Sequence, residues 1–178
     1  GTCESSMRIV IVSRIFTPEL SAAPFLLEAC AVAFRDAGHE VEVLTTRPPR
    51  ALQINDPDGV RVRRASVLRD KQGYVRGYLS YLSFDIPAFF RLLLSARADL
   101  YLVEPPPTTG AVVRVSSALR RTPYVYDAAD LWSDAAAMVT RSTLVLKALR
   151  FVEKFAMNGA SHAFAISDGL IARMREIG

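Results

Sequence analysis

The amino-terminal stretch of the chain constrains its fold more than any other feature. An apolar run over Arg8–Ser13 is typical of a buried strand, and Ala22–Ala37 repeats apolar residues at helical spacing before Gly38 stops the helix. The following run, Glu40–Thr45, alternates as a strand does. A strand, a helix and a second strand make a βαβ unit, so the sequence predicts an open parallel sheet whose ligands bind at the carboxyl ends of its strands.

The rest of the chain extends this pattern. Helical patterns cover Thr109–Arg120 and Arg141–Asn158, and the proline-rich segment 47–59, with its Pro57-Asp58-Gly59 turn, is a predicted loop. We therefore expect a single α/β domain with about six parallel strands flanked by helices. Further strand-like runs are Val60–Arg64, Asp99–Val103, Tyr124–Asp127 and Ser161–Ile166.

Composition bounds the class of protein. The 178 residues, 51% hydrophobic and 22% charged, suit one globular domain. Apolar runs fall short of the roughly 20 residues that span a bilayer, and the amino terminus lacks the pattern of a signal peptide, so we expect a cytoplasmic location. Residues 1–6 resemble a leader outside the domain, which we expect to occupy residues 7–178.

Cysteine and histidine usage predicts neither a disulfide nor a metal site. Cys3 and Cys30 have no paired spacing, and His39 and His162 lie far from other ligand types. We expect no cofactor. The net charge of +4 is compatible with phosphate-bearing ligands or an anionic membrane surface, whereas basic residues interspersed with acids disfavour nucleic acid.

Familiar catalytic motifs are missing. The segment after the first strand, 13–24, contains no glycine, which argues against a dinucleotide fingerprint or a P-loop there. The chain also lacks the G-x-S-x-G elbow of serine hydrolases. Candidate chemistry is therefore confined to polar loops at the predicted carboxyl ends of the strands.

Three of these loops are candidate binding loops. The first holds Phe16 and Glu19, with Ser21 and Ala22 small enough to let a ligand approach the next helix; an ordinary tight connection is the alternative. The second, 45–50, carries arginines that could bind a phosphate or could simply be solvated at the surface. The third, 104–110, has three prolines and places Thr108 and Thr109, with free amides, at a helix start.

The fourth loop, 126–134, has the densest chemistry. Asp127, Asp130 and Asp134 accompany Trp132, the only tryptophan of the chain. Carboxylates orient or deprotonate hydroxyl groups, and an indole stacks on a sugar face, so this set suits a carbohydrate acceptor. The alternative needs no ligand: Asp127 ends the strand, Asp130 or Ser133 caps a short helix, and Trp132 anchors the loop in the core.

An aromatic stretch between residues 74 and 94 is a candidate membrane or acceptor face. Tyr74, Tyr78 and Tyr81 are spaced four and three apart, and Arg76 lies among them. One helical face of this kind can lie in a membrane interface, or it can simply pack on the sheet.

With these residues in view, the chain resembles the amino-terminal half of a GT-B glycosyltransferase of family 4, in the branch that builds bacterial surface polysaccharides. The opening strand with Phe16-Thr17-Pro18-Glu19 resembles the family's F-x-P-E loop, and Gly38-His39-Glu40-Val41 resembles its G-H-E-V turn. Later similar landmarks, in order, are Tyr81–Phe84, Glu104–Pro106, Asp127–Trp132 and Ile166–Leu170.

The resemblance implies two Rossmann-like domains that face each other across a cleft. The acceptor would bind the amino-terminal domain, and the nucleotide-sugar donor would bind mainly a carboxyl-terminal domain that this sequence lacks, so the chain alone is expected to be inactive. Retention of configuration without a metal ion is implied too. The D-L-W run at Asp130–Trp132 favours Asp130 as the catalytic candidate.

The leading interpretation is therefore a transferase domain that serves a lipid-linked or glycan acceptor at the inner face of the cytoplasmic membrane. The alternative is a freestanding Rossmann-like or flavodoxin-like module that binds a small phosphorylated ligand without catalysis. Whether the reading frame continues into a second α/β domain would discriminate between the two.

Overall fold

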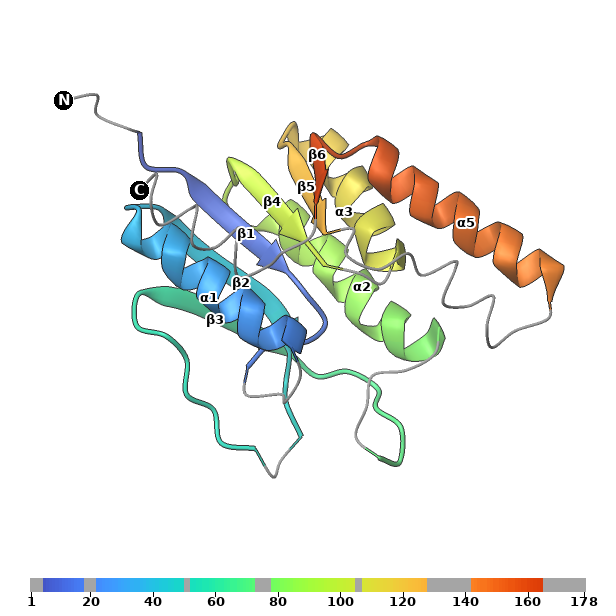
Figure 1. The fold of residues 1–178 in the computed structure, drawn as a ribbon, viewed down its shortest axis with the longest axis horizontal. Coiled ribbons are helices and arrows are strands. Elements are labelled where there is room, and N and C mark those ends of the chain that lie inside the picture. The colour runs from blue at the N-terminus through green and yellow to red at the C-terminus, as the bar shows by residue number, and fades with distance from the viewer. Residues whose placement is uncertain are drawn as a thin grey trace.

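The computed structural model describes residues 5–17, 22–49, 52–72, 78–104, 107–127 and 142–164. A six-stranded parallel sheet has the order β3-β2-β1-β4-β5-β6 (Figure 1). Its strands are β1 (Arg8–Val12), β2 (Glu40–Thr46), β3 (Val60–Ala65), β4 (Leu100–Val103), β5 (Tyr124–Asp127) and β6 (His162–Phe164). The expected Rossmann-like parallel sheet flanked by helices is confirmed.

Helices cover both faces of the sheet. The helices are α1 (Ala22–Asp36), α2 (Tyr78–Leu94), α3 (Pro107–Arg120) and α5 (Thr143–Asn158). In Figure 1 α1 crosses the face toward the viewer, while α2 and α3 lie behind the sheet. The core is correspondingly split, with Leu27 and Cys30 of α1 in one cluster and Phe84, Val113 and Ala156 in the other.

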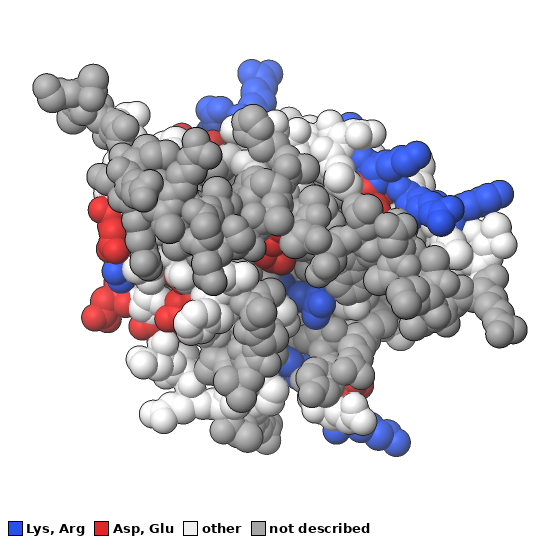
Figure 2. Space-filling model, in the orientation of Figure 1, with Lys and Arg blue, Asp and Glu red and all other residues white. Residues whose placement is uncertain are grey.

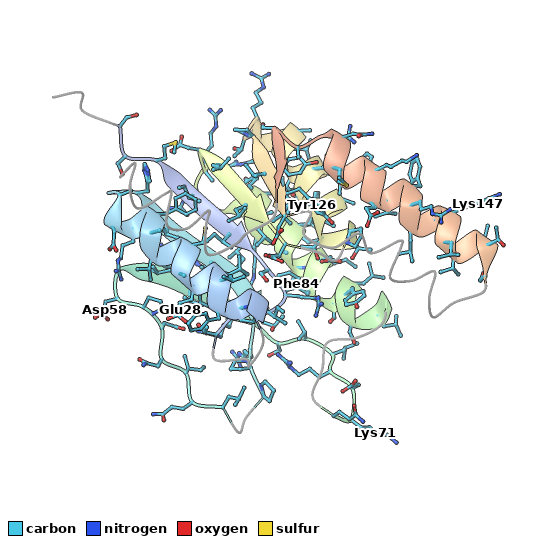
Figure 3. The ribbon with its side chains drawn as sticks, viewed as in Figure 1. Glu28, Asp58, Lys71, Phe84, Tyr126 and Lys147 are labelled. Carbon is cyan, nitrogen blue, oxygen red and sulfur yellow. The ribbon has the colours of Figure 1, made fainter. Side chains whose placement is uncertain are left out.

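Two interior strands are buried on both faces, as parallel strands require. In β1, residues Ile9 to Val12 are all buried and alternate between the two core clusters. The partly polar β2 pairs with β1 through Val41 opposite Ile9 and Val43 opposite Ile11. Figure 3 shows Phe84 and Tyr126 inside the molecule, whereas Asp58, Lys71 and Lys147 point outward.

Element boundaries follow local chemistry. Gly38 adopts φ 91°, the left-handed conformation that ends α1, as the sequence predicts. The predicted start of α3 at Thr109 is wrong by two residues: α3 begins at Pro107, because proline is tolerated in a first turn whose N–H groups have no helical partner. The predicted start of α5 at Arg141 is also too early, because Ser142 is the N-cap and accepts a hydrogen bond from the Val145 N–H.

Within the described ranges, every helix is too short or too polar to reach across a lipid bilayer.

Candidate functional site

The topological switch point lies between β1 and β4. From β1 the chain turns toward β2 and β3, whereas β4 leads to β5 and β6 on the other side, so the loops after β1 and β4 diverge. The Glu104 N–H donates to the Val12 carbonyl (3.0 Å), which holds the two strand ends together before they part. In open parallel sheets ligands bind at this position. The loop 13–17, Glu104 and the first turn of α3 border it.

The loop after β1 is fixed by its neighbours. The Ser13 hydroxyl donates to the Ile15 carbonyl (2.6 Å), and the Thr46 hydroxyl donates to the Arg14 carbonyl (2.7 Å). These bonds tie the loop to itself and to the end of β2, so its backbone is held in place without a ligand.

Two arginines extend this support toward β3. Arg64 makes a bidentate pair with Asp56 (2.7 and 2.6 Å) and donates to the Thr17 carbonyl (3.0 Å). Arg69 donates to the Thr46 hydroxyl (3.1 Å) and to the Arg47 carbonyl. Bidentate arginine pairs constrain geometry as well as charge, so these contacts join the loops after β1, β2 and β3.

A set of polar side chains from three elements meets beside the switch point. We call Arg14, Tyr81, Asp85, Thr108 and Thr109 the switch-point cluster. The Thr109 hydroxyl donates to Oδ1 of Asp85 (2.5 Å), and the Arg14 guanidinium lies 5.4 Å from the centre of the Tyr81 ring. Asp85 is fully buried and Thr109 nearly so.

Burial dominates the electrostatics of this cluster. It raises the pKa of Asp85 above the ordinary carboxyl value, while the Thr109 and Thr108 hydroxyls and the charge of Arg14 oppose the shift. Within the described residues, Oδ2 of Asp85 and Oγ1 of Thr108 are buried and neither makes a hydrogen bond of normal geometry, although the Thr108 hydroxyl lies close enough to Asp85 to lower its pKa. Half-satisfied networks of this kind are costly in a protein interior, and they are found at functional sites.

Carboxylates gather at the ends of β4 and β5. Glu104 and Asp127 are 9% and 5% exposed. Burial raises the pKa of the Cys30 thiol in α1 to about 12, and the charges of these two carboxylates add to the shift. Burial also raises the pKa of Tyr126, with Glu153, Glu104 and Asp127 contributing. Negative charge is thus concentrated on this side of the switch point.

Some predicted site residues can be located. Phe16 is 2% exposed and belongs to the α1-side core, so it has a packing role, and its contact with substrate stays a prediction. Ala22 begins α1, Thr108 lies in the first turn of α3, and Asp127 ends β5. Tyr81 is half-buried beside Arg14, which gives it a contact with the loop after β1 rather than a fully outward position.

Other predicted residues lie outside the described residues: Glu19, Ser21, Tyr74, Arg76, Asp130 and Trp132. Tyr78 begins α2, but its side chain is not among those described. The roles assigned to these residues stay predictions. The described residues hold no group of three His, Cys, Asp or Glu side chains arranged for a metal ion.

The sequence analysis missed Asp85, Arg14 and Thr109 as members of one cluster. A usable signal existed for Asp85, because it is the single acidic residue in the predominantly apolar 17-residue helix α2. The loop that precedes α3 marked Thr109 together with Thr108, but not its contact with Asp85, because that contact depends on how α2 and α3 pack.

A depression of about 320 Å³ lies at the opposite edge of the sheet, by the amino ends of β2 and β3. Its carboxylates already pair with arginines, since Glu40 and Glu42 bind Arg8 at 2.9 and 2.8 Å. The depression therefore offers weaker grounds for a ligand site than the switch point. It is lined by Glu40, Val41, Glu42, Gly59, Val60 and Arg61.

The strand order and the switch-point cluster define a Rossmann-like α/β domain with its candidate site at the carboxyl edge of the sheet. Sequence comparison then gives the family: the glycosyl transferase 4-like domain matches residues 27–178, and the chain belongs to that family. No curated protein sequence matches the chain.

Solved structures agree on the fold. HepE (Alr3699) of Anabaena in complex with UDP-glucose is 17% identical, with a TM-score of 0.55. The match covers 94% of this chain and 40% of that chain, so this chain spans less than half the length of HepE. A DNA/pantothenate metabolism flavoprotein of Streptococcus pneumoniae is 18% identical, over 56% of this chain and 41% of that one, but its TM-score of 0.31 is too low to bear on the fold.

Proposed function

We propose that this chain is the acceptor-side domain of a two-domain glycosyltransferase that transfers a sugar from a nucleotide-sugar donor to a lipid-linked or glycan acceptor. The observation that carries the proposal is the family match over residues 27–178. Cell-surface polysaccharide or glycolipid synthesis is the process we propose, with retention of configuration. The match covers only 40% of HepE, which supports a longer parent protein, and we propose that a second domain of that protein carries most of the donor site.

The site geometry supports an acceptor role for this half. The half-buried members of the switch-point cluster, Arg14, Tyr81 and Thr108, and the carboxylates of Glu104 and Asp127 supply donors and acceptors for sugar hydroxyl groups at one edge of the sheet. In our proposal Asp130 contacts the acceptor or the reacting sugar, and Trp132 stacks on a sugar ring. Phe16, Glu19, Ser21, Ala22, Thr108 and Asp127 complete the proposed binding surface.

The test is turnover of a nucleotide-sugar panel, UDP-glucose included, by the full-length protein, with this chain run alongside. We expect turnover by the full-length protein, a fall of about a hundredfold or more with Asp130→Ala, and none by the chain alone. Asp58→Ala is the matched control, because Asp58 is an exposed aspartate beside the amino end of β3.

Each contrary outcome has a distinct meaning. Turnover by the chain alone would overturn the division into an acceptor half and a donor half. If the full-length protein turned over none of the donors, the result would instead favour a freestanding module that binds a small phosphorylated ligand without catalysis.

We further propose peripheral contact with the inner face of the cytoplasmic membrane, through the outer surface of α2. This surface exposes an apolar stripe at helical spacing, consisting of Leu79, Leu82, Ile86, Phe90 and Leu94. Such a stripe, where basic residues flank it, is typical of helices that lie in a membrane interface.

Charge on the same side of the sheet supports this contact. Helices α2, α3 and α5 carry only two acids, Asp85 and Glu153, and both are buried. Their six basic residues are Arg91, Arg114, Arg120, Lys147, Arg150 and Lys154. In Figure 2 basic side chains extend over α5 at the right, whereas acidic ones gather at the left beside α1.

Flotation with phosphatidylglycerol vesicles tests the membrane contact. We expect the chain to float with these vesicles and not with phosphatidylcholine alone, and Leu82→Gln with Phe90→Gln to abolish binding. Phe25→Gln is the matched control, because Phe25 is exposed on α1, across the sheet. Equal flotation of both variants would contradict the assignment to α2.

A further inference from the structure

Asp85 is unusually placed for a charged residue. It is fully buried on the face of α2 that packs in the core, one position after the buried Phe84. A carboxylate in such a position disfavours folding unless its charge is compensated, and an apolar residue of similar size would pack at lower cost. A purpose other than stability is therefore the better explanation for a carboxylate here.

The contacts of Asp85 reach two other elements. Its Oδ1 accepts the hydrogen bond from Thr109 in the first turn of α3 (2.5 Å), where the helix dipole favours a negative charge. The positive charge of Arg14, in the loop after β1, also acts on it. Arg14 in turn lies over Tyr81, one helical turn before Asp85 in α2.

The network around Asp85 is only half satisfied. Oδ1 accepts from Thr109, whereas Oδ2 and the neighbouring Thr108 hydroxyl are buried and, in the part of the chain that the structure describes, make no hydrogen bond of normal geometry. The Thr108 hydroxyl acts on Asp85 only at longer range. A polar network that served stability alone would satisfy these atoms, since each unpaired buried group has a cost. Both atoms belong to the elements that border the switch point.

We propose that Asp85 is a positioning residue, whose carboxylate holds the first turn of α3 and the Arg14 loop in the arrangement that binds the acceptor. This inference rests on the proposed function. Asp85 itself, being fully buried, does not touch the substrate. It acts through Thr109 on α3 and through charge on Arg14.

The proposal has a pH signature. The groups that face Asp85 are the Arg14 guanidinium from the loop after β1 and the Thr108 and Thr109 hydroxyls from α3. The Thr109, Thr108 and Arg14 contacts lower the pKa of Asp85 against the larger effect of burial, so an opening that breaks these contacts while Asp85 stays buried raises this pKa further and becomes easier as the pH falls. An opening that hydrates Asp85 lowers the pKa instead and becomes easier as the pH rises. The Asp85→Asn variant lacks that titration.

Hydrogen exchange with the present chain tests the positioning role directly. At neutral pH we expect Asp85→Asn to raise exchange about tenfold in peptides that cover residues 13–17 and 107–110, the effect of replacing a charge-assisted hydrogen bond by a neutral one. Its melting temperature should not fall, because a buried charge has been removed. Thr109→Val should reproduce the loosening near residue 109, Thr109→Ser should restore protection, and Asp58→Asn should change nothing.

The pH dependence separates positioning from simple packing. From about pH 8 to about pH 4, protection corrected for the intrinsic exchange rate should fall in these segments of the wild type and stay flat in Asp85→Asn. A uniform rise in exchange along the variant with a lower melting temperature would overturn the proposal, because Asp85 would then be a packing residue. Unchanged exchange in both segments would overturn it as well.

The full-length protein supplies the functional arm. With the donor that the wild type turns over, Asp85→Asn should lower kcat/KM about tenfold to a hundredfold and remove the acid limb of the pH profile. An unchanged kcat/KM would overturn the positioning role while leaving the proposed function in place. A full-length wild type that turns over no donor would contradict the proposed function. The exchange experiment would still decide whether Asp85 holds the two segments.

Discussion

The two edges of the sheet differ in how fully their buried carboxylates and hydroxyl groups are paired. At the amino edge Glu42 is 3% exposed, yet both of its oxygens are paired, with Arg8 at 2.8 Å and Arg63 at 3.3 Å. At the carboxyl edge, Thr45, Asp85 and Thr108 each keep a buried oxygen that has no hydrogen-bond partner within the described residues, whereas at the amino edge Nε of Arg8 is such an atom. The comparison agrees with a structural role for the amino edge and with the binding role that we propose for the carboxyl edge.

This division has a physical basis. Buried polar groups stabilise a fold only when they are paired, and an unpaired one is maintained at the expense of stability. In parallel α/β sheets the carboxyl edge also collects loops and helix amino termini, which bind ligands. The pattern of unpaired atoms therefore agrees with the proposed acceptor site independently of the family match.

The largest expected effect concerns the packing beneath the carboxyl edge. A Cβ added at Gly110 would lie 2.6 Å from the Tyr126 ring and 2.8 Å from Cβ of Ala156, both of which are buried. Gly110→Ala should therefore lower the free energy of unfolding by about 2 to 3 kcal/mol despite the better helix propensity of alanine. Urea unfolding measures this, with the exposed Val115→Ala as control. A stable Gly110→Ala would mean that α3 and α5 can separate readily.

A smaller loss is expected at the amino edge. Glu42→Ala removes one of the two carboxylate partners of Arg8 and the carboxylate partner of Arg63. It should destabilise the protein by about 2 kcal/mol, less than for a fully enclosed pair because the Arg63 side chain is 45% exposed. Glu40→Ala removes a second partner of Arg8, but Glu40 is 61% exposed, so its cost should stay below about 0.5 kcal/mol. If the two variants lost the same free energy of unfolding, burial of the ion pair would not explain its contribution to stability. Urea unfolding of both variants measures this.

At the carboxyl edge one substitution should stabilise the protein. Thr45 is fully buried, and its hydroxyl has no hydrogen-bond partner among the residues that the structure describes, so Thr45→Val should raise the free energy of unfolding by about 0.5 kcal/mol. The neighbouring Thr46→Val should lower it by about 1 kcal/mol, because the Thr46 hydroxyl donates to Arg14 and accepts from Arg69. Chemical denaturation of both variants checks the pair. A loss with Thr45→Val would contradict the interpretation of this edge.

The last prediction leaves stability unchanged and uses Cys30 as a reporter. Burial, with the charges of Glu104 and Asp127, raises its pKa from 9.0 to about 12, so the folded thiol is protonated at a pH where an unfolded one is half ionised. In a Cys3→Ser background, iodoacetamide at pH about 9 should label Cys30 only in urea. Rapid labelling of the folded chain would show that the carboxyl edge opens readily.

Much of the fold follows from local sequence. The β5 bounds and the glycine stop of α1 agree with prediction because apolar runs, helical spacing and glycine conformation act over a few residues. The start of α3 was misplaced because three consecutive prolines also suit a loop, and only the surrounding structure selects a helix at Pro107. The strand order also depends on packing between elements that are distant in sequence, so local patterns do not predict it.

The sequence by itself determined the layers of this protein, its parallel sheet and the family to which it is similar. Tertiary structure decided which polar residues meet: Arg14, Asp85 and Thr109 come from three separate segments and share one buried network only because α2 and α3 pack side by side at the switch point. It also decided which of their atoms stay unpaired. Periodicity encodes burial along one element, whereas hydrogen-bond satisfaction depends on atoms contributed by several elements at once.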